Sequence, residues 1–335
     1  MEEISRKKFL RLCGAIVAGG AVAGVSGVVM SRGVSYLGAT SPDKLKLGND
    51  DTFTSPYRLV SSFDAPGTVQ ALAQHGGTAY AVTANEVLVL DARGRLQRQF
   101  PVKDDIVRDA AVDDGEIYLL HPAKICVYSP AGDLLREWEA CSELSNYCSL
   151  ALSTDFVFVT DINNKNICQY TREGRFVRFI GSPNKFIIPS LTFGIECIGD
   201  VIYCSNSGRH QVESYALDGK YLAVFGRHGA APGLFTGCCN PVYLSHTASG
   251  DIITSEKGDP RICCYGRDGS FRSMLLDSRL LGGGNTAYDV KVWKDRLFVA
   301  GKNKISVFRY DETLASAGAC ASCSVDCPLR TGVDV

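Results

Sequence analysis

The sequence has no excess of charge of either sign. Its 35 Lys and Arg residues stand against 36 Asp and Glu residues, so the formal net charge at pH 7 is -1. A protein that binds nucleic acid through its overall charge is therefore not expected. Charged residues make up 21% of the chain and hydrophobic residues 45%. This composition allows a large buried core and excludes a wholly disordered protein.

Several motifs that would identify an enzyme are also missing. The 335 residues contain no Gly-x-Ser-x-Gly nucleophile elbow, no phosphate-binding glycine loop and no His-Glu-x-x-His zinc motif. Helical periodicity is nearly absent between Leu59 and Tyr310. The sequence gives no direct evidence of catalysis, and we expect a chain that is not itself an enzyme.

An uncharged segment lies near the N-terminus. Nineteen residues from Leu12 to Met30 carry no charge, and they follow the basic segment Ser-Arg-Lys-Lys-Phe-Leu-Arg at 5–11. A helix of this length reaches about 28 Å, marginally enough to cross a membrane. The order Ser-Arg-Lys-x-Phe-Leu resembles a twin-arginine export signal, with Lys7 in place of the second arginine. We therefore expect residues 1–32 to be a signal or an inner-membrane anchor of an exported, periplasmic protein, either cleaved or retained.

An internal repeat fills the middle of the chain. An aromatic residue or a leucine is followed four residues later by glycine five times, and the glycines are 38, 42, 45 and 50 residues apart. Each copy alternates short apolar segments with polar turns, and four short strands per ~40 residues are typical of a propeller blade. A degenerate sixth copy at 305–310 lacks the glycine. The five pairs are Leu90 with Gly94, Tyr128 with Gly132, Tyr170 with Gly174, Tyr215 with Gly219, and Tyr265 with Gly269.

Six repeats predict an all-β, six-bladed β-propeller, because a single blade cannot bury both of its faces and the blades must close into a ring. We expect the propeller at 59–311, after a polar linker at 33–58 and before a Cys-rich tail at 312–335. The third to fifth copies resemble NHL repeats, notably at 161–174 and 206–215. The resemblance implies the architecture and not an activity, since this family includes binding modules, scaffolds, lyases and hydrolases.

Nine of the 14 cysteines fall into three groups. Cys126, Cys168 and Cys263 each follow an isoleucine at the same position of the repeat. We expect these three, together with Cys204, to pack as small apolar residues between the sheets.

The second group is the adjacent pair Cys238 and Cys239, at the start of the fifth blade. The side chains of neighbouring cysteines diverge, so the pair is not an ordinary zinc motif. His228 and His246 flank the pair and could add ligands. The blade is nevertheless the richest in Cys, Glu, Lys and Arg, and we expect it to carry the functional face, with Cys238 and Cys239 as candidate metal ligands. The expected binding face consists of Asn240, Glu256, Lys257 and Arg261.

The third group is Cys320, Cys323 and Cys327 in the tail. The spacing C-x-x-C-x-x-x-C-P resembles the end of a ferredoxin-type cluster motif. We expect these cysteines to bind an iron–sulfur cluster or another metal, with a fourth ligand from elsewhere such as Cys238 or Cys239. Disulfide or thiol redox chemistry, and a tail without a function, are the alternatives.

Together these features predict an extracytoplasmic propeller that serves as a docking module for a redox or electron-transfer system. The expected partner is a protein, such as a membrane redox complex. Two alternatives stay open. The first is a propeller enzyme, a lactonase-like hydrolase or a lyase, with a channel metal held by Asp109, Glu196 and Asp289. The second is a purely structural interaction module.

Overall fold

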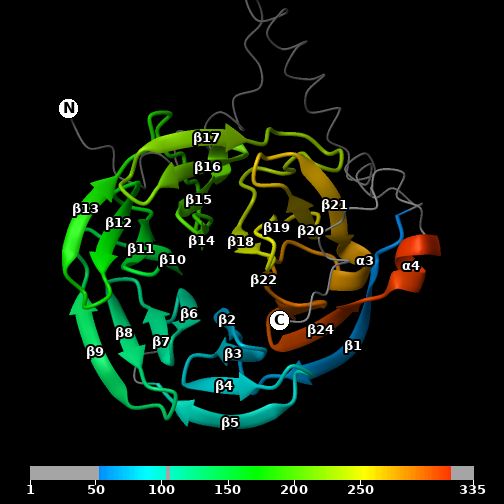
Figure 1. Cartoon of the computed structure of the whole chain (residues 1–335), viewed down its shortest axis with the longest axis horizontal. Coiled ribbons are helices and arrows are strands. Elements are labelled where there is room, and N and C mark those ends of the chain that lie inside the picture. The colour runs from blue at the N-terminus through cyan, green and yellow to red at the C-terminus, as the bar shows by residue number, and fades with distance from the viewer. Residues whose placement is uncertain (1–52, 103–105, 318–335) are drawn as a thin grey trace, which may run out of the picture. The chain divides into compact units, whose positions relative to one another are not determined.

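The fold is a ring of six four-stranded antiparallel sheets, seen down its axis in Figure 1. The computed structural model describes residues 53–102 and 106–317. The innermost strand of each blade lies beside those of its two neighbours, so the six blades close into a ring. The expectation of an all-β, six-bladed propeller is confirmed.

The first five blades follow one another along the chain, each from its innermost to its outermost strand. Their strands are β2 (Ala71–His75), β3 (Thr78–Val82), β4 (Glu86–Leu90) and β5 (Leu96–Pro101); β6 (Asp109–Asp113), β7 (Glu116–Leu120), β8 (Lys124–Tyr128) and β9 (Leu134–Glu139); β10 (Tyr147–Leu152), β11 (Phe156–Asp161), β12 (Asn166–Thr171) and β13 (Phe176–Ile180); β14 (Ile195–Ile198), β15 (Val201–Asn206), β16 (Gln211–Ala216) and β17 (Tyr221–Phe225); and β18 (Tyr243–His246), β19 (Ile252–Glu256), β20 (Arg261–Tyr265) and β21 (Phe271–Leu276). Short helical turns are η2 (Ser207–Arg209), α3 (Ser278–Leu281) and α4 (Glu312–Ala317).

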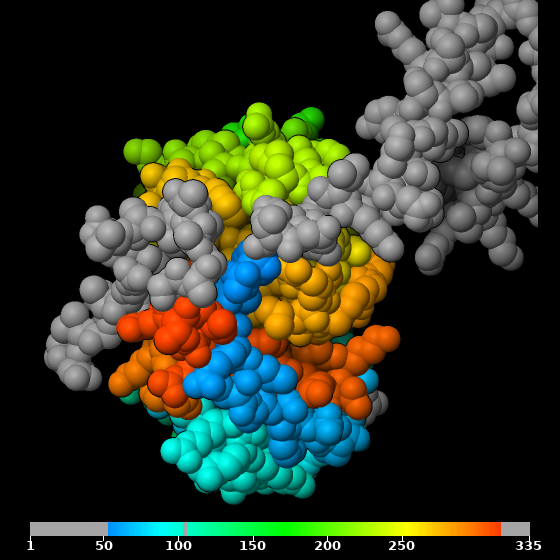
Figure 2. All heavy atoms as spheres, turned by 90° about the vertical axis from the view of Figure 1, so that its right-hand side faces the viewer, coloured from blue at the N-terminus to red at the C-terminus, as the bar shows by residue number. Residues whose placement is uncertain are grey.

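The sixth blade takes its strands from both ends of the propeller. Three come from the C-terminal part, β22 (Asp289–Trp293), β23 (Arg296–Ala300) and β24 (Lys304–Tyr310), and the fourth is β1 (Tyr57–Asp64). β1 runs antiparallel to β24, with Tyr57 opposite Tyr310. Figure 2 shows the blue β1 lying among the orange and red C-terminal elements. The propeller thus begins two residues before the expected start at Leu59.

Middle strands are buried and outermost strands are amphipathic. The second and third strands, such as β7 and β8, are almost completely buried because neighbouring blades stack on both of their faces. The outermost strand β9 places Arg136 and Trp138 inward and leaves the residues between them exposed.

The cysteines that share a repeat position lie in the core, as expected. Cys126, Cys168, Cys204 and Cys263 are all buried between the blades. The expected signal or anchor at 1–32, the linker up to residue 52 and the three tail cysteines lie outside the described residues. Within 53–102 and 106–317, no helix is long and apolar enough to span a membrane.

Candidate functional site

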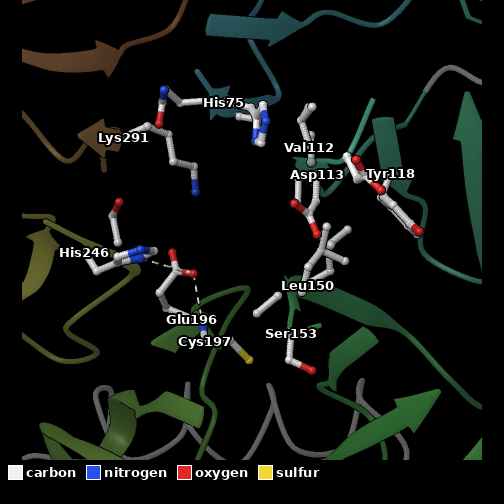
Figure 3. A pocket seen from close by; sticks show the side chains of 18 of the residues that line it. His75, Val112, Asp113, Tyr118, Leu150, Ser153, Glu196, Cys197, His246 and Lys291 are labelled. Carbon is white, nitrogen blue, oxygen red and sulfur yellow. Dashed lines mark hydrogen bonds and ion pairs between the residues drawn. The ribbon is translucent and has the colours of Figure 1, made fainter. Parts of the chain in front are cut away.

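A cavity of about 1070 Å³ opens where the innermost strands end. All six of these strands, and the turns that follow them, contribute to its wall. We call this cavity the funnel. Figure 3 shows Lys291, His246 and Glu196 together on one side of it and Asp113 and Tyr118 on the other.

His246 and Glu196 form an ion pair in the funnel. His246 is the last residue of β18, and its Nδ1 lies 3.6 Å from Oε1 of Glu196 on the neighbouring β14. Burial lowers the pKa of His246, but the Glu196 carboxylate outweighs this effect and the net pKa is raised. The His246 side chain is 41% exposed, whereas that of Glu196 is 17% exposed. Glu196 therefore holds one ring nitrogen and leaves the other, Nε2, for a ligand.

Lys291 places an ammonium group beside this pair. Its Nζ lies 3.6 Å from Oδ1 of Asp289, two residues earlier on β22, and Figure 3 shows the side chain extending into the funnel. Burial lowers the pKa of Lys291, but the carboxylates of Asp289, Asp109 and Glu196 together raise it. Lys291 is therefore a cation at the bottom of the funnel. The sequence contains a signal for this arrangement, since residues i and i+2 of a strand share a face.

Two of the expected channel carboxylates link neighbouring blades. Asp109 Oδ2 accepts hydrogen bonds from the Leu150 amide at 2.9 Å and from the Ser149 hydroxyl. Asp289 Oδ2 accepts one from the Leu72 amide at 2.9 Å. Each aspartate is the first residue of an innermost strand and binds the main chain of the next blade. Buried N–H groups need such partners, so these carboxylates stabilise the ring.

The opposite wall of the funnel has charges that are paired with each other. Arg172, in the turn after β12, forms an ion pair with Asp113, and its guanidinium lies 5.5 Å from the centre of the Tyr118 ring. Arg172 Nε also donates to the Ser153 carbonyl at 2.9 Å. The charged groups on this wall are therefore paired with each other, and the other wall is formed by Lys291 and His246 with their partners Asp289 and Glu196.

The expected binding face on the fifth blade is mostly buried. Asn240, Glu256 and Arg261 are 1%, 0% and 2% exposed, and Lys257 alone is partly exposed. Arg261 donates from Nε to Glu256 Oε1 at 2.9 Å and from Nη1 to the Ala230 carbonyl at 3.0 Å. These charges hold the loop between β17 and β18 in place, so three of the four residues do not form an exposed surface.

Cys238 and Cys239 lie toward the opposite face of the propeller from the funnel. They precede β18, whereas the funnel lies where β18 ends. His246 therefore lies at the opposite end of β18 from Cys238 and Cys239. The ring of His228 packs edge-on against the ring of His210, with 4.7 Å between the two ring centres. In the part of the chain that the structure describes, no group of three or more His, Cys, Asp or Glu residues is arranged to hold a metal ion.

Comparisons with known proteins find the fold again. No protein-family model matches the chain, and no curated protein sequence matches it. A streptogramin B lyase structure is similar, with 16% identity, a TM-score of 0.55, and coverage of 76% of this chain and 98% of the lyase. Virginiamycin B lyase from Staphylococcus aureus has 14% identity, a TM-score of 0.53 and coverage of 76% and 99%. The WD40 propeller domain of Doa1 has 9% identity, a TM-score of 0.54 and coverage of 77% and 98%. These similarities show a shared propeller fold.

Proposed function

We propose that the funnel binds a small molecule with a carbonyl or carboxylate oxygen, and that His246 acts on it as a general base. The observation that carries this proposal is the ion pair of His246 and Glu196 on the wall of the funnel, on the same side as the Lys291 ammonium. An oriented imidazole next to a fixed cation is the arrangement that proton abstraction from a carbonyl compound requires. This proposal develops the alternative of a propeller hydrolase or lyase.

The reaction would use the three side chains in separate roles. Neutral His246 takes a proton at Nε2, either from a carbon next to the carbonyl group or from a water molecule that attacks it. The ammonium of Lys291 stabilises the negative charge that then develops on the oxygen. Glu196 stabilises the imidazolium that forms. The first route leads to elimination and the second to hydrolysis, and two of the similar structures are lyases by title.

A panel of small molecules tests this proposal. Lactones, esters and carboxylates with a leaving group on the β carbon are incubated with the full chain, and NMR follows their turnover. We expect His246→Gln to reduce turnover by about 10²- to 10⁴-fold, and Lys291→Met to reduce it as well. Lys220→Met is the matched control, because Lys220 is an exposed lysine that does not line the funnel. Equal turnover in the wild type and His246→Gln, or no binding of any panel member, contradicts the proposal.

The titration of His246 gives an independent test. A general base must be neutral, so turnover should rise as the pH increases through the raised pKa of His246. Glu196→Gln removes the carboxylate that raises this pKa, and the NMR titration midpoint of His246 should shift to lower pH. An unchanged His246 midpoint would show that Glu196 does not control the imidazole.

A second proposed function follows from the sequence of the tail and from the N-terminal segment. We propose that the chain is exported and docks with a redox partner, and that Cys320, Cys323 and Cys327 carry an iron–sulfur cluster or another metal. The C-x-x-C-x-x-x-C-P spacing supports it. Iron, zinc and acid-labile sulfide are measured in the full chain, purified without oxygen, and in a variant with all three cysteines changed to Ser. Equal metal content in the two proteins would overturn this role of the tail.

A further inference from the structure

Cys238 and Cys239 present two adjacent sulfur atoms with different surroundings. Their Sγ atoms are 3.1 Å apart in the loop between β17 and β18. Cys238 is exposed, whereas Cys239 is only 2% exposed. A reagent in solution therefore reaches the sulfur of Cys238 first, and the sulfur of Cys239 lies directly behind it.

The inner sulfur lies beside a hydroxyl and a cation. Ser190 Oγ is 3.6 Å from Cys239 Sγ and accepts a hydrogen bond from Lys257 Nζ at 3.2 Å. Burial raises the pKa of Cys239, but hydrogen bonds with Cys238, Ser190 and Lys257 outweigh it, and the net pKa is lowered. The hydrogen bond with Cys239 raises the pKa of Cys238. The inner sulfur is therefore the one that carries a thiolate more readily.

One amide side chain, that of Asn240, links the loop that holds the sulfurs to the following turn. Asn240 Nδ2 donates to the carbonyl oxygens of Thr236 at 2.7 Å and Lys257 at 2.9 Å. Asn240 Oδ1 accepts a hydrogen bond from the Lys257 amide at 2.9 Å. Asn240 thus ties the cysteine loop to the turn that carries Lys257, which keeps the cation near Cys239.

A second pair of adjacent cysteines shows that sequence alone does not create this contact. Cys263 and Cys264 are neighbours on β20, where successive side chains point to opposite faces of the sheet. Cys263 accordingly packs in one hydrophobic cluster and Cys264 in another. The loop geometry at 238–239, and not the Cys-Cys dipeptide, brings two sulfurs together.

We propose that Cys238 and Cys239 form a redox-active dithiol that exchanges with a disulfide. The exposed Cys238 thiol passes its proton to the adjacent Cys239 thiolate and attacks one sulfur of the external disulfide. This breaks the S–S bond, forms a mixed disulfide on Cys238 and releases one thiolate, which takes up the proton from Cys239. Cys239 then attacks the Cys238 sulfur and releases the second thiolate. In total the two thiols lose two electrons and two protons to form a Cys238–Cys239 disulfide, and the external disulfide is reduced to two thiols.

Lys257 acts most directly in the reverse reaction. An external thiolate attacks the exposed Cys238 sulfur, and Cys239 leaves as a thiolate beside Ser190 and the Lys257 ammonium. A leaving thiol with a lower pKa leaves faster. The surroundings of Cys239 thus make the vicinal disulfide easy to reduce. This inference depends neither on catalysis in the funnel nor on metal in the tail.

Peptide mapping of the full chain tests the inference. After oxidation with glutathione disulfide, remaining thiols are alkylated and the chain is cut with trypsin, which isolates peptide 228–257 with Cys238 and Cys239 as its only cysteines. We expect the mass of this peptide to be lower than that of the reduced peptide by two hydrogens, and we expect no attached glutathione. Cys263 and Cys264 should stay reduced during the oxidation and should then be found alkylated. They serve as the matched control. Two alkylated thiols at 238 and 239 across all glutathione ratios would overturn the inference.

Two variants test the separate roles of the sulfurs and the cation. Cys239→Ser should trap glutathione on Cys238, because the second step is lost. Lys257→Met should slow reduction of the vicinal disulfide about threefold for each unit by which the pKa of Cys239 rises. The oxidation is then repeated with a small disulfide-bonded protein in place of glutathione disulfide. The faster of the two reactions shows whether the dithiol prefers a protein disulfide or a low-molecular-weight one. A lasting glutathione adduct on the wild type, or an unchanged rate in Lys257→Met, contradicts the proposed mechanism.

Discussion

Gly174 packs against the indole ring of Trp138 on the preceding blade. A Cβ atom on Gly174 would lie 2.6 Å from that ring, and the φ angle of Gly174 is +92°. The glycine that ends each repeat is therefore also a contact between blades. The same relationship occurs at the other four repeat glycines, which are Gly94 with Val307, Gly132 with Phe100, Gly219 with Ile180, and Gly269 with Phe225.

Replacing Gly174 with Ala should destabilise the propeller by about 2–4 kcal/mol. The methyl group must adopt a left-handed backbone conformation and also push the Trp138 ring aside. Urea unfolding measures the change. Gly181→Ala is the matched control, since nothing lies within 4 Å of its added Cβ and its φ is not positive. Equal losses in the two variants would contradict this account.

Removing β1 should open the ring. Deleting residues 1–64 takes away the strand that pairs with β24, including Tyr57, which is 2% exposed. Burial of that aromatic ring alone is worth about 3 kcal/mol, which corresponds to a melting temperature lower by roughly 6–12 °C. The unpaired edge of β24 also favours aggregation. Deletion of residues 1–52 only is the control, and a shift there as large as in the 1–64 deletion would refute the role of β1.

Ionisation of Asp289 should oppose folding near neutral pH. Burial first, and then the nearby Asp109, raise the pKa of Asp289 from 3.8 to about 6. Because the folded state binds the proton more tightly, this contribution to stability is fully present below pH 4 and is lost as the pH rises through 6. Relative to Asp289→Asn, the wild type should lose on the order of 2 kcal/mol between pH 4 and 7. Urea unfolding at several pH values measures this difference, and a constant difference would contradict it.

Breaking the buried pair of Arg261 and Glu256 should be costly. Arg261→Met leaves the Glu256 carboxylate without its partner in a fully buried position. We expect a loss of about 3–5 kcal/mol in the free energy of unfolding. The exposed pair of Arg309 and Asp295 is the control, since Arg309→Met should change stability by less than about 1 kcal/mol. Similar losses in both variants would mean that burial of the first pair does not matter.

The repeat glycines predicted the blades because they mark a turn that recurs in every blade with a local third-to-fourth strand connection. The sixth copy lacks its glycine for a structural reason. Its third strand, β24, pairs with β1 from the other end of the propeller, so no turn joins them. A local pattern cannot reveal this pairing, since the partner strand is nearly a whole propeller away in the sequence.

The sequence indicated that Asp109 and Asp289 lie in innermost strands, but it did not indicate what their carboxylates bind. Asp109 and Asp289 were named as metal ligands only in the alternative of a propeller enzyme, and their main contacts are amides of the next blade. Lys291 and His246 were not expected beside Glu196, because three separate blades bring them together only when the ring closes. On the fifth blade, charge suggested exposure, yet Glu256 and Arg261 neutralise each other inside the protein.

The pairing of β1 with β24 also constrains the order of events during protein synthesis. β1 leaves the ribosome before the strands of any complete blade, and its partner is made last. Until then, one face and one edge of β1 lack their final contacts. The ring consequently cannot close before β24 has left the ribosome, so the sixth blade is completed only after the strands of the other five have been made.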